Sequence, residues 1–152
     1  IEPEPLLTKF PKILGLDNRK MSKSYNNYIA LSDEPDVIRK KVMTMFTDPK
    51  RIKLEDKGHP EECNLYSYYK IFKLDLAQGV LDYCTKANIG CTECKKRLAE
   101  VIIDYLKAIR EKRKIFIKNI DEVEKILKDG ANKAEEFASK TIIEVKKAVG
   151  LL

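Results

Sequence analysis

The chain has 152 residues, of which 43% are hydrophobic and 36% are charged, and this length favours one domain with a trailing segment over two complete domains. No apolar run approaches the ~20 residues that a membrane-spanning helix needs, so a membrane protein is not expected. The formal net charge of +6 favours polyanionic partners such as nucleic acids.

Residues 1–18 contain three prolines and Gly15, together with the short apolar pairs Leu6-Leu7 and Ile13-Leu14. This composition predicts an extended, partly unsupported segment, such as the last strand of a sheet whose other strands are missing. The chain begins without Met and shows no basic or apolar leader region. We therefore expect a piece of a cytoplasmic protein.

Cations and hydroxyl groups alternate in the segment Arg19–Asn27, which has almost nothing apolar to bury. Lysine provides a mobile point charge, and serine hydroxyls and loop N–H groups add hydrogen-bond donors that fit the oxygens of a triphosphate. A solvated basic loop is the alternative interpretation for any two lysines. On residue types alone both interpretations stand.

Helical spacing begins after Ser32-Asp33-Glu34-Pro35, a sequence that favours a helix start. The predicted buried stripe of this helix consists of Ile38, Val42, Met45 and Phe46. Residues 50–60 then predict an exposed loop, and its His59, the only histidine, is expected to be solvated.

A second helix is predicted from Asn64, as its N-cap, through Phe72. Its tyrosines at 66, 68 and 69 suit either stacking on nucleic-acid bases or packing in a core, and packing is favoured at this spacing. Residues 76–86 predict a short helix weakened by Gly79, and Asn88-Ile89-Gly90 predicts a tight turn.

The longest apolar stripe lies on a helix predicted to begin near Thr92, and its members are Leu98, Val101, Ile102, Tyr105, Leu106 and Ile109. The basic run Arg110–Lys114 interrupts the stripe and predicts a solvated turn, with contact to a nucleic-acid backbone as the less favoured alternative. A short helix over 121–128, ended by Gly130, and a final amphipathic helix over 131–149 complete an all-α helical bundle.

Four cysteines, Cys63, Cys84, Cys91 and Cys94, follow the spacing C-x20-C-x6-C-x2-C. In a reducing cytosol, clustered cysteines hold metal more often than they form disulfides. Cys91 and Cys94 lie at a predicted helix start, where free N–H groups stabilise thiolates. The pattern favours a metal centre over unrelated buried thiols, and both zinc and iron–sulfur chemistry use four thiolates.

The segment Lys20-Met21-Ser22-Lys23-Ser24 resembles the KMSKS signature of class I aminoacyl-tRNA synthetases. Its surroundings are similar to tryptophanyl-tRNA synthetases: Gly15-Leu16-Asp17 before it, and Tyr25-Asn26-Asn27, Leu31, Asp33, Pro35 and Thr47-Asp48-Pro49 after it. The likeness extends through the helix from Cys91 to the closing Ala-rich helix. One departure is Ala108, where relatives often have proline, which should leave that helix straighter.

The resemblance implies the C-terminal portion of a homodimeric ligase that joins tryptophan to ATP, with magnesium, and then transfers it to tRNA-Trp. Lys20 and Lys23 would be catalytic, and all of Lys20–Ser24 would contact ATP. The Rossmann body and its HIGH signature are missing from the sequence. Residues 1–34 would end the catalytic domain, 35–120 would form the helical anticodon-binding domain, and 121–152 would pack back on the catalytic domain.

A subset of bacterial members of this family carries a C-x22-C-x6-C-x2-C motif that binds a 4Fe-4S cluster. The last two intervals match here and the first is shorter, so the resemblance implies an iron–sulfur cluster, with zinc as the second choice. Lys95, Lys96 and Arg97 are the predicted tRNA contacts. The competing hypotheses are a stand-alone, metal-stabilised tRNA-binding module without catalysis and a zinc-stapled interaction domain.

Overall fold

The computed structural model describes residues 2–152, which form helices and no β-strand, and this confirms the all-α prediction. The chain divides into two compact units, residues 1–110 and 111–152. Its elements are α1 (Pro35–Met43), η1 (Pro60–Glu62), α2 (Asn64–Phe72), α3 (Leu74–Thr85), α4 (Cys91–Lys118) and α5 (Ile120–Ala148).

The first unit begins with irregular backbone, where a remnant strand was expected. Leu14 and Lys20 form a single isolated antiparallel bridge, which closes when Gly15 N donates to Arg19 O at 2.6 Å and Met21 N donates to Ile13 O at 2.9 Å. The segment folds back on itself over this bridge, and no neighbouring strand extends the ladder within the described residues. Leu6 and Leu7 remain exposed.

Helix α1 starts at Pro35, as predicted, and buries Ile38 and Val42 completely. The predicted stripe is wrong at its end, because Phe46 is 38% exposed. The helix stops at Met43, so helical spacing no longer decides which side chain points inward. Phe46 instead donates its backbone N–H to Leu16 O at 2.7 Å.

The N-cap assignment for α2 also needs correction. Cys63 occupies the N-cap and Asn64 is the first helical residue. The Asn64 side chain is buried and donates to a distant carbonyl group instead of capping its own helix. Tyr66, Tyr68 and Tyr69 are buried, which confirms that packing was the better prediction for these rings.

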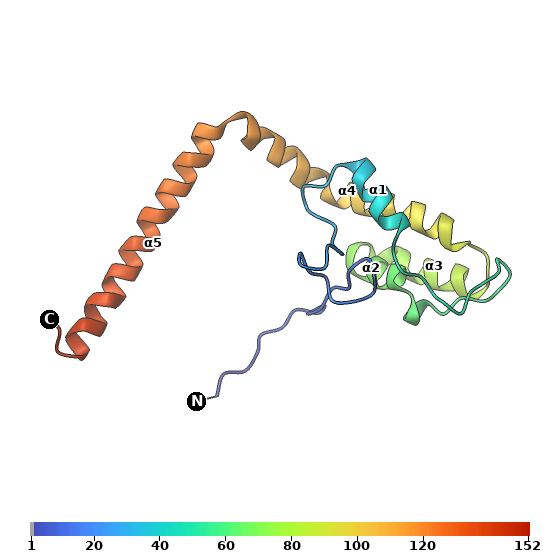
Figure 1. Cartoon of the computed structure of the whole chain (residues 1–152), viewed down its shortest axis with the longest axis horizontal. Helices are drawn as coiled ribbons and strands as arrows, with labels where there is room; N and C mark the ends of the chain where they lie inside the picture. Colours follow the sequence, from blue (N-terminus) through green and yellow to red (C-terminus); the bar gives the residue numbers. More distant parts are fainter. Residues whose placement is uncertain (1) are drawn as a thin grey trace. The chain divides into compact units, whose positions relative to one another are not determined.

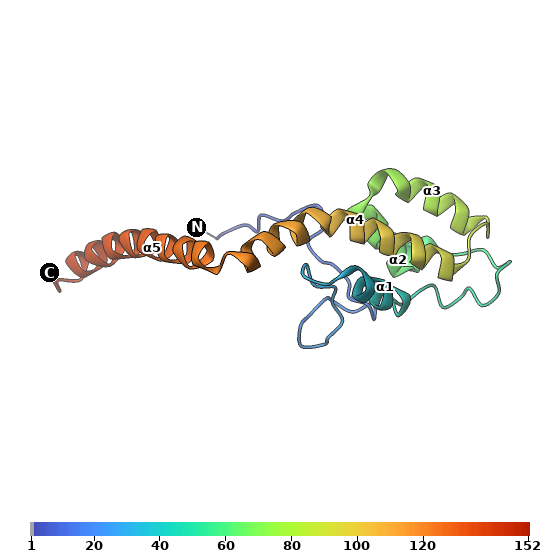
Figure 2. The same ribbon diagram turned by 90° about the horizontal axis from the view of Figure 1, so that it is seen from above.

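The core of the first unit lies between α2 and the first half of α4, with α1 and α3 gathered around them (Figures 1 and 2). Leu98, Ile102 and Leu106 are buried at successive turns of α4. Tyr105 and Ile109 belong to the predicted stripe but are 57% and 41% exposed, so the buried stripe is narrower than expected. Tyr105 still meets the Phe72 ring edge-on, with centroids 5.1 Å apart.

Helices continue where the sequence predicted breaks. Residues 110–114 are helical, so the predicted solvated turn is wrong, and Gly130 lies inside one continuous α5. A glycine inside a helix costs only ~1 kcal/mol relative to alanine, which strong helix formers on both sides offset. No residue of α5 is buried, and its apolar side chains such as Phe137 face solvent. None of the described helices is long and apolar enough to cross a membrane.

Candidate functional site

The KMSKS loop, residues 20–24, projects from the bridge between Leu14 and Lys20. Lys20, Lys23 and Ser24 are exposed, and Met21 and Ser22 are half-buried. The Ser22 hydroxyl accepts a hydrogen bond from Ser24 N at 3.2 Å. Both lysine side chains are therefore free to reach an anion in solvent, while the backbone that carries them is ordered by local hydrogen bonds.

Asn27 lies buried at the base of this loop and hydrogen-bonds to its backbone. It is only 3% exposed, and its Oδ1 accepts from Ser22 N at 2.8 Å. Its Nδ2 donates to Asp17 Oδ1 at 2.7 Å and to Lys20 O at 3.3 Å. One buried amide thus contacts the loop at two backbone positions, a role that the sequence analysis did not assign to Asn27.

Asp17 carries the charge of this network. Hydrogen bonding from Asn27, together with Arg19, lowers the pKa of the Asp17 carboxyl group to about 2 against the opposing effect of burial. Arg19 Nε lies 2.7 Å from Asp17 Oδ2, and its guanidinium group lies over the Tyr25 ring at 4.3 Å. Asp17 is therefore a carboxylate, and a hydrogen-bond acceptor only, at neutral pH.

Helix α2 attaches this loop to the helical core. Asn64 Nδ2 donates to Gly15 O at 2.6 Å, and the Tyr68 hydroxyl group donates to Leu14 O at 2.6 Å. Gly15 also packs so tightly against Asn27 that a β-carbon there would collide with the asparagine side chain and carbonyl group. The backbone just before the KMSKS loop is thereby held between two buried asparagines.

The four cysteines occupy one neighbourhood of the first unit, at the starts of α2 and α4 and near the end of α3. All are free thiols. Burial raises the pKa of Cys94 to about 12, and electrostatic repulsion from the other three cysteines adds to the shift. Burial likewise raises the pKa of Cys63 and of Cys84. Without a positive centre Cys63, Cys84 and Cys94 stay protonated at neutral pH.

The donor set fits a sulfur-ligated group in kind, because the four thiols lie near enough to one another to interact electrostatically. A single tetrahedral zinc ion would require sulfur atoms within about 4 Å of one another. Within residues 2–152 no three His, Cys, Asp or Glu side chains are gathered as one metal ion requires.

The loop before η1 runs beside these thiols and is ordered by Asp48. The Asp48 carboxylate is buried and accepts from His59 N at 2.7 Å and from Lys50 N at 2.9 Å, while His59 Nδ1 lies 2.9 Å from it. Burial alone would raise the pKa of Asp48, but these hydrogen bonds lower it overall. Farther along, Gly58 N donates to Cys84 O at 3.0 Å. His59 is half-exposed, yet it also helps to position the cysteine neighbourhood.

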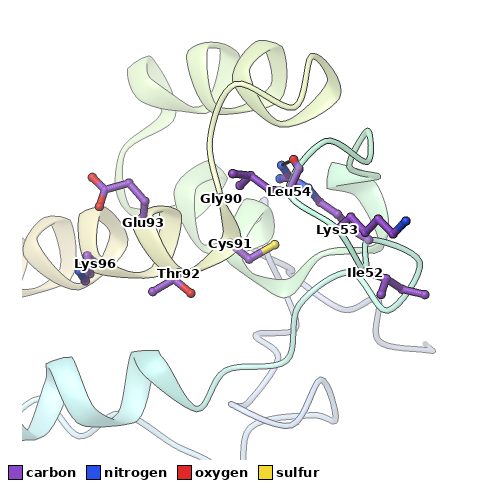
Figure 3. Close-up of a pocket in the computed structure, with 9 residues that line it drawn as sticks. Ile52, Lys53, Leu54, Gly90, Cys91, Thr92, Glu93 and Lys96 are labelled. Atoms are coloured by element: carbon purple, nitrogen blue, oxygen red, sulfur yellow. Dashed lines mark hydrogen bonds between the residues drawn. The ribbon is translucent and has the colours of Figure 1, made fainter.

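A pocket of about 450 Å³ opens where this loop meets the start of α4 (Figure 3). The Cys91 sulfur points toward the loop, and Leu54 lies against Gly90. Arg51 donates to Ile89 O at 2.7 Å and to Leu54 O at 2.8 Å, so within residues 2–152 its hydrogen-bond partners are carbonyl groups. The lining residues are Arg51, Ile52, Lys53, Leu54, Gly90, Cys91, Thr92, Glu93 and Lys96.

The three predicted tRNA contacts point in different directions. Lys96 lines the pocket. Lys95 Nζ donates to Met43 O at 3.0 Å, and Arg97 forms an ion pair with Glu93 at 3.0 Å. Of these three, only Lys96 therefore presents its charge to the pocket. Arg51 and Lys53 also line it, from a loop distant in sequence, and no pattern in the sequence indicated them.

Arg110 departs most from its expected surroundings. It belongs to the basic run predicted to be solvated, yet it is only 7% exposed. Its Nη2 donates to Ile103 O at 2.7 Å, and its buried Nη1 has no hydrogen-bond partner among the described residues. The side chain packs along its own helix and is not available as a surface cation.

Comparison with known proteins places these features in context. Residues 1–107 match the family described as tRNA synthetases class I (W and Y). The chain is 45% identical over 152 residues to the tryptophan–tRNA ligase of Aquifex aeolicus and 37% identical over 153 residues to that of Thermotoga maritima. It covers 38% and 47% of these two proteins, while 99% of this chain is aligned in each case.

Solved structures give a consistent likeness. The crystal structure of tryptophanyl-tRNA synthetase from Campylobacter jejuni complexed with ADP and tryptophan is 28% identical, with a TM-score of 0.79. The similarity covers 92% of this chain and 44% of that one. The chain thus spans less than half the length of the proteins that it matches.

Proposed function

Since this chain belongs to the class I tRNA synthetases of the tryptophan and tyrosine type, we propose that it is the C-terminal part of a tryptophan–tRNA ligase. The complete enzyme would form tryptophanyl-adenylate and pyrophosphate from tryptophan and ATP, with magnesium, and transfer the tryptophanyl group to tRNA-Trp. The KMSKS loop carries this proposal, because it presents two exposed ammonium groups on a backbone fixed by buried hydrogen bonds.

Lys20 and Lys23 would stabilise the negative charge that develops on the phosphates as pyrophosphate leaves. The hydroxyl groups of Ser22 and Ser24 would donate to phosphate oxygens, and Met21 would contribute its backbone. Ser22 N is already bonded to Asn27, so phosphate recognition would depend chiefly on side chains in this loop.

Tryptophan-dependent exchange of pyrophosphate into ATP by the full-length enzyme tests this activity. Lys23→Ala should lower kcat/KM for ATP by about 100-fold or more, since a charge acting on the transition state is lost. Lys12→Ala removes an exposed lysine from the same segment and should leave exchange unchanged. The 152-residue chain alone, without the rest of the catalytic body, should show no exchange above the Lys23→Ala background.

We further propose that residues 35–120 bind the anticodon arm of tRNA, with residues 1–34 completing the catalytic domain and residues 121–152 packing back on it. The pocket beside Cys91 supports this, because Arg51, Lys53 and Lys96 surround a space of about 450 Å³. Lys95, Lys96 and Arg97 are the proposed tRNA contacts on α4. Lys96 should contribute most, since the other two have partners within the chain.

Titration with tRNA-Trp and an unrelated tRNA across a range of salt concentrations tests the interface. Lys96→Ala should weaken binding and reduce the salt slope by about one, as expected for one lost phosphate contact. Lys107→Ala, an exposed lysine farther along α4, is the matched control and should leave the slope unchanged. Equal binding of both tRNAs at every salt concentration would contradict a specific anticodon interface.

For the cysteines we propose a 4Fe-4S cluster, with zinc as the second choice, ligated by Cys63, Cys84, Cys91 and Cys94. The shared neighbourhood of the four thiols and the nearby cations support an anionic thiolate centre. A bound cluster would take the four sulfurs as thiolate ligands and tie α2, α3 and α4 together. Iron, sulfide and zinc content and the visible spectrum of anaerobically prepared protein distinguish the two, and Cys91→Ser and Cys94→Ser should be the most damaging changes.

The remaining features of the complete protein follow from the family. We propose that it is a homodimer acting in the cytoplasm, where tRNA is aminoacylated. The mass of the full-length enzyme in solution, measured by light scattering, tests the dimer.

A further inference from the structure

Beyond the lysines and serines of the KMSKS loop, one buried residue controls the loop's shape. Asn27 contacts two backbone groups of the loop, Ser22 N at 2.8 Å and Lys20 O at 3.3 Å. These two groups flank Met21, on either side of which the two lysines emerge. A shift of the Asn27 side chain would therefore move the backbone from which both lysine side chains extend.

The orientation of the Asn27 amide is fixed by its neighbours. The Asp17 carboxylate can only accept, so it must face the NH₂ group of Asn27, and the opposite oxygen atom then faces Ser22 N, which can only donate. Arg19 holds Asp17 from the other side at 2.6 Å. The amide has one orientation that satisfies all of its partners.

Asn27 is itself held by contacts to the segment that precedes the loop. Its carbonyl oxygen accepts from Leu16 N at 2.8 Å, and its side chain lies against Gly15, where no β-carbon fits. Gly15 O is in turn held by Asn64 of helix α2. The network therefore connects the loop to the helical core through hydrogen bonds.

We propose that Asn27 is a positioning residue for phosphate binding, which fixes the base of the KMSKS loop through its hydrogen bonds to Ser22 N, Lys20 O and Asp17. The inference rests on the proposed function, because it assigns a role within the same ATP site. A charge stabilises a transition state only from the right position, and a displacement of about 1 Å can cost about 100-fold in rate.

The deciding variant is Asn27→Asp, which keeps the shape of the side chain and the acceptor for Ser22 N but places a carboxylate against Asp17. Asn26→Asp is the matched control, because it adds the same charge one residue away on an exposed side chain. The double variant Asp17→Asn with Asn27→Asp exchanges donor and acceptor, and so restores the hydrogen bond between the two positions and the original net charge, but not the bond to Lys20 O, which a carboxylate cannot donate.

Two measurements are made on the full-length enzyme. In pyrophosphate exchange, Asn27→Asp should lower kcat/KM for ATP by about 10- to 100-fold with KM for tryptophan unchanged, and the double variant should recover part of this loss. In hydrogen exchange, the Ser22 amide should be protected in the wild type and in Asn26→Asp, and lose protection in Asn27→Asp.

The outcomes separate the possibilities. If Asn27→Asp behaves as Asn26→Asp does in both measurements, the positioning role is overturned. A parallel fall in thermal stability and in the use of both substrates, without recovery in the double variant, would also overturn it in favour of a general structural role. A wild-type enzyme without tryptophan-dependent exchange would overturn the proposed function instead, and protection of the Ser22 amide would still decide whether Asn27 holds the loop.

Discussion

Removal of one hydroxyl group tests how helix α2 supports the KMSKS loop. Tyr68 is 1% exposed, and its hydroxyl group donates to Leu14 O at 2.6 Å. Tyr68→Phe keeps the buried ring, so the hydrophobic contribution to stability is retained and only the hydrogen bond is lost. The Leu14 carbonyl accepts no other hydrogen bond within the described residues, so its desolvation is left uncompensated.

A lost hydrogen bond that leaves a partly buried carbonyl unpaired costs about 1–2 kcal/mol of unfolding free energy. With a urea dependence of about 2 kcal/mol per molar, the unfolding midpoint should fall by about 0.5–1 M at an unchanged slope. Tyr66→Phe is the matched control on the same helix, because that ring is also buried and its hydroxyl group donates to no residue of the described chain.

The assay is equilibrium unfolding in urea, followed by circular dichroism, on wild type and both variants. The expected order of stability is Tyr66→Phe close to wild type and Tyr68→Phe clearly below it. Equal midpoints for the two variants would refute the reasoning, since the bond to Leu14 would then contribute nothing. A changed slope for Tyr68→Phe would instead mean that the loop segment had already detached in the folded state.

Three further predictions concern stability. Leu98→Ala should cost about 2–5 kcal/mol in the same urea assay, because Leu98 is fully buried, whereas loss of the exposed Leu127 should cost less than about 0.5 kcal/mol. Gly58→Ala should lower the melting temperature, because its β-carbon would collide with the Cys84 sulfur, while Gly130→Ala meets no atom and should raise it. The pKa of Asp48 is lower in the folded protein than its unfolded value of about 4, so its carboxylate stabilises the fold above that pH, and this stability is lost as the pH falls through the folded pKa. Wild type should therefore lose stability on acidification. Asp48→Asn should be less stable than wild type at neutral pH but should lose less on acidification.

Local patterns in the sequence predicted the helices of the first unit well. The spacing of Leu98, Ile102 and Leu106 identified the buried face of α4, and Pro35 identified the start of α1. These signals work because they depend on neighbours within a few residues. They failed at Gly130, where the local cost of glycine was smaller than the preference of its flanking residues for a helix.

The candidate site was predictable only in part. The KMSKS residues were identified by their order, but the support given by Asn27 and Asn64 was not, because a buried asparagine is identified by its partners and not by its spacing. Asn64 meets a carbonyl group 49 residues earlier in the chain. Arg51 likewise joins the pocket from a loop 40 positions before Cys91, a distance that no periodic pattern spans.

The attachment of the loop to α2 also has a consequence for the order of folding. Leu14 and Gly15 receive their hydrogen bonds from residues 54 and 49 positions later in the chain. During synthesis the KMSKS segment leaves the ribosome well before α2 does, and closing so long a span has an entropic cost that the local contacts of the loop do not share. The loop should therefore reach its final conformation only after α2 has formed, which makes the final ordering of the KMSKS loop a late event in the folding of this unit.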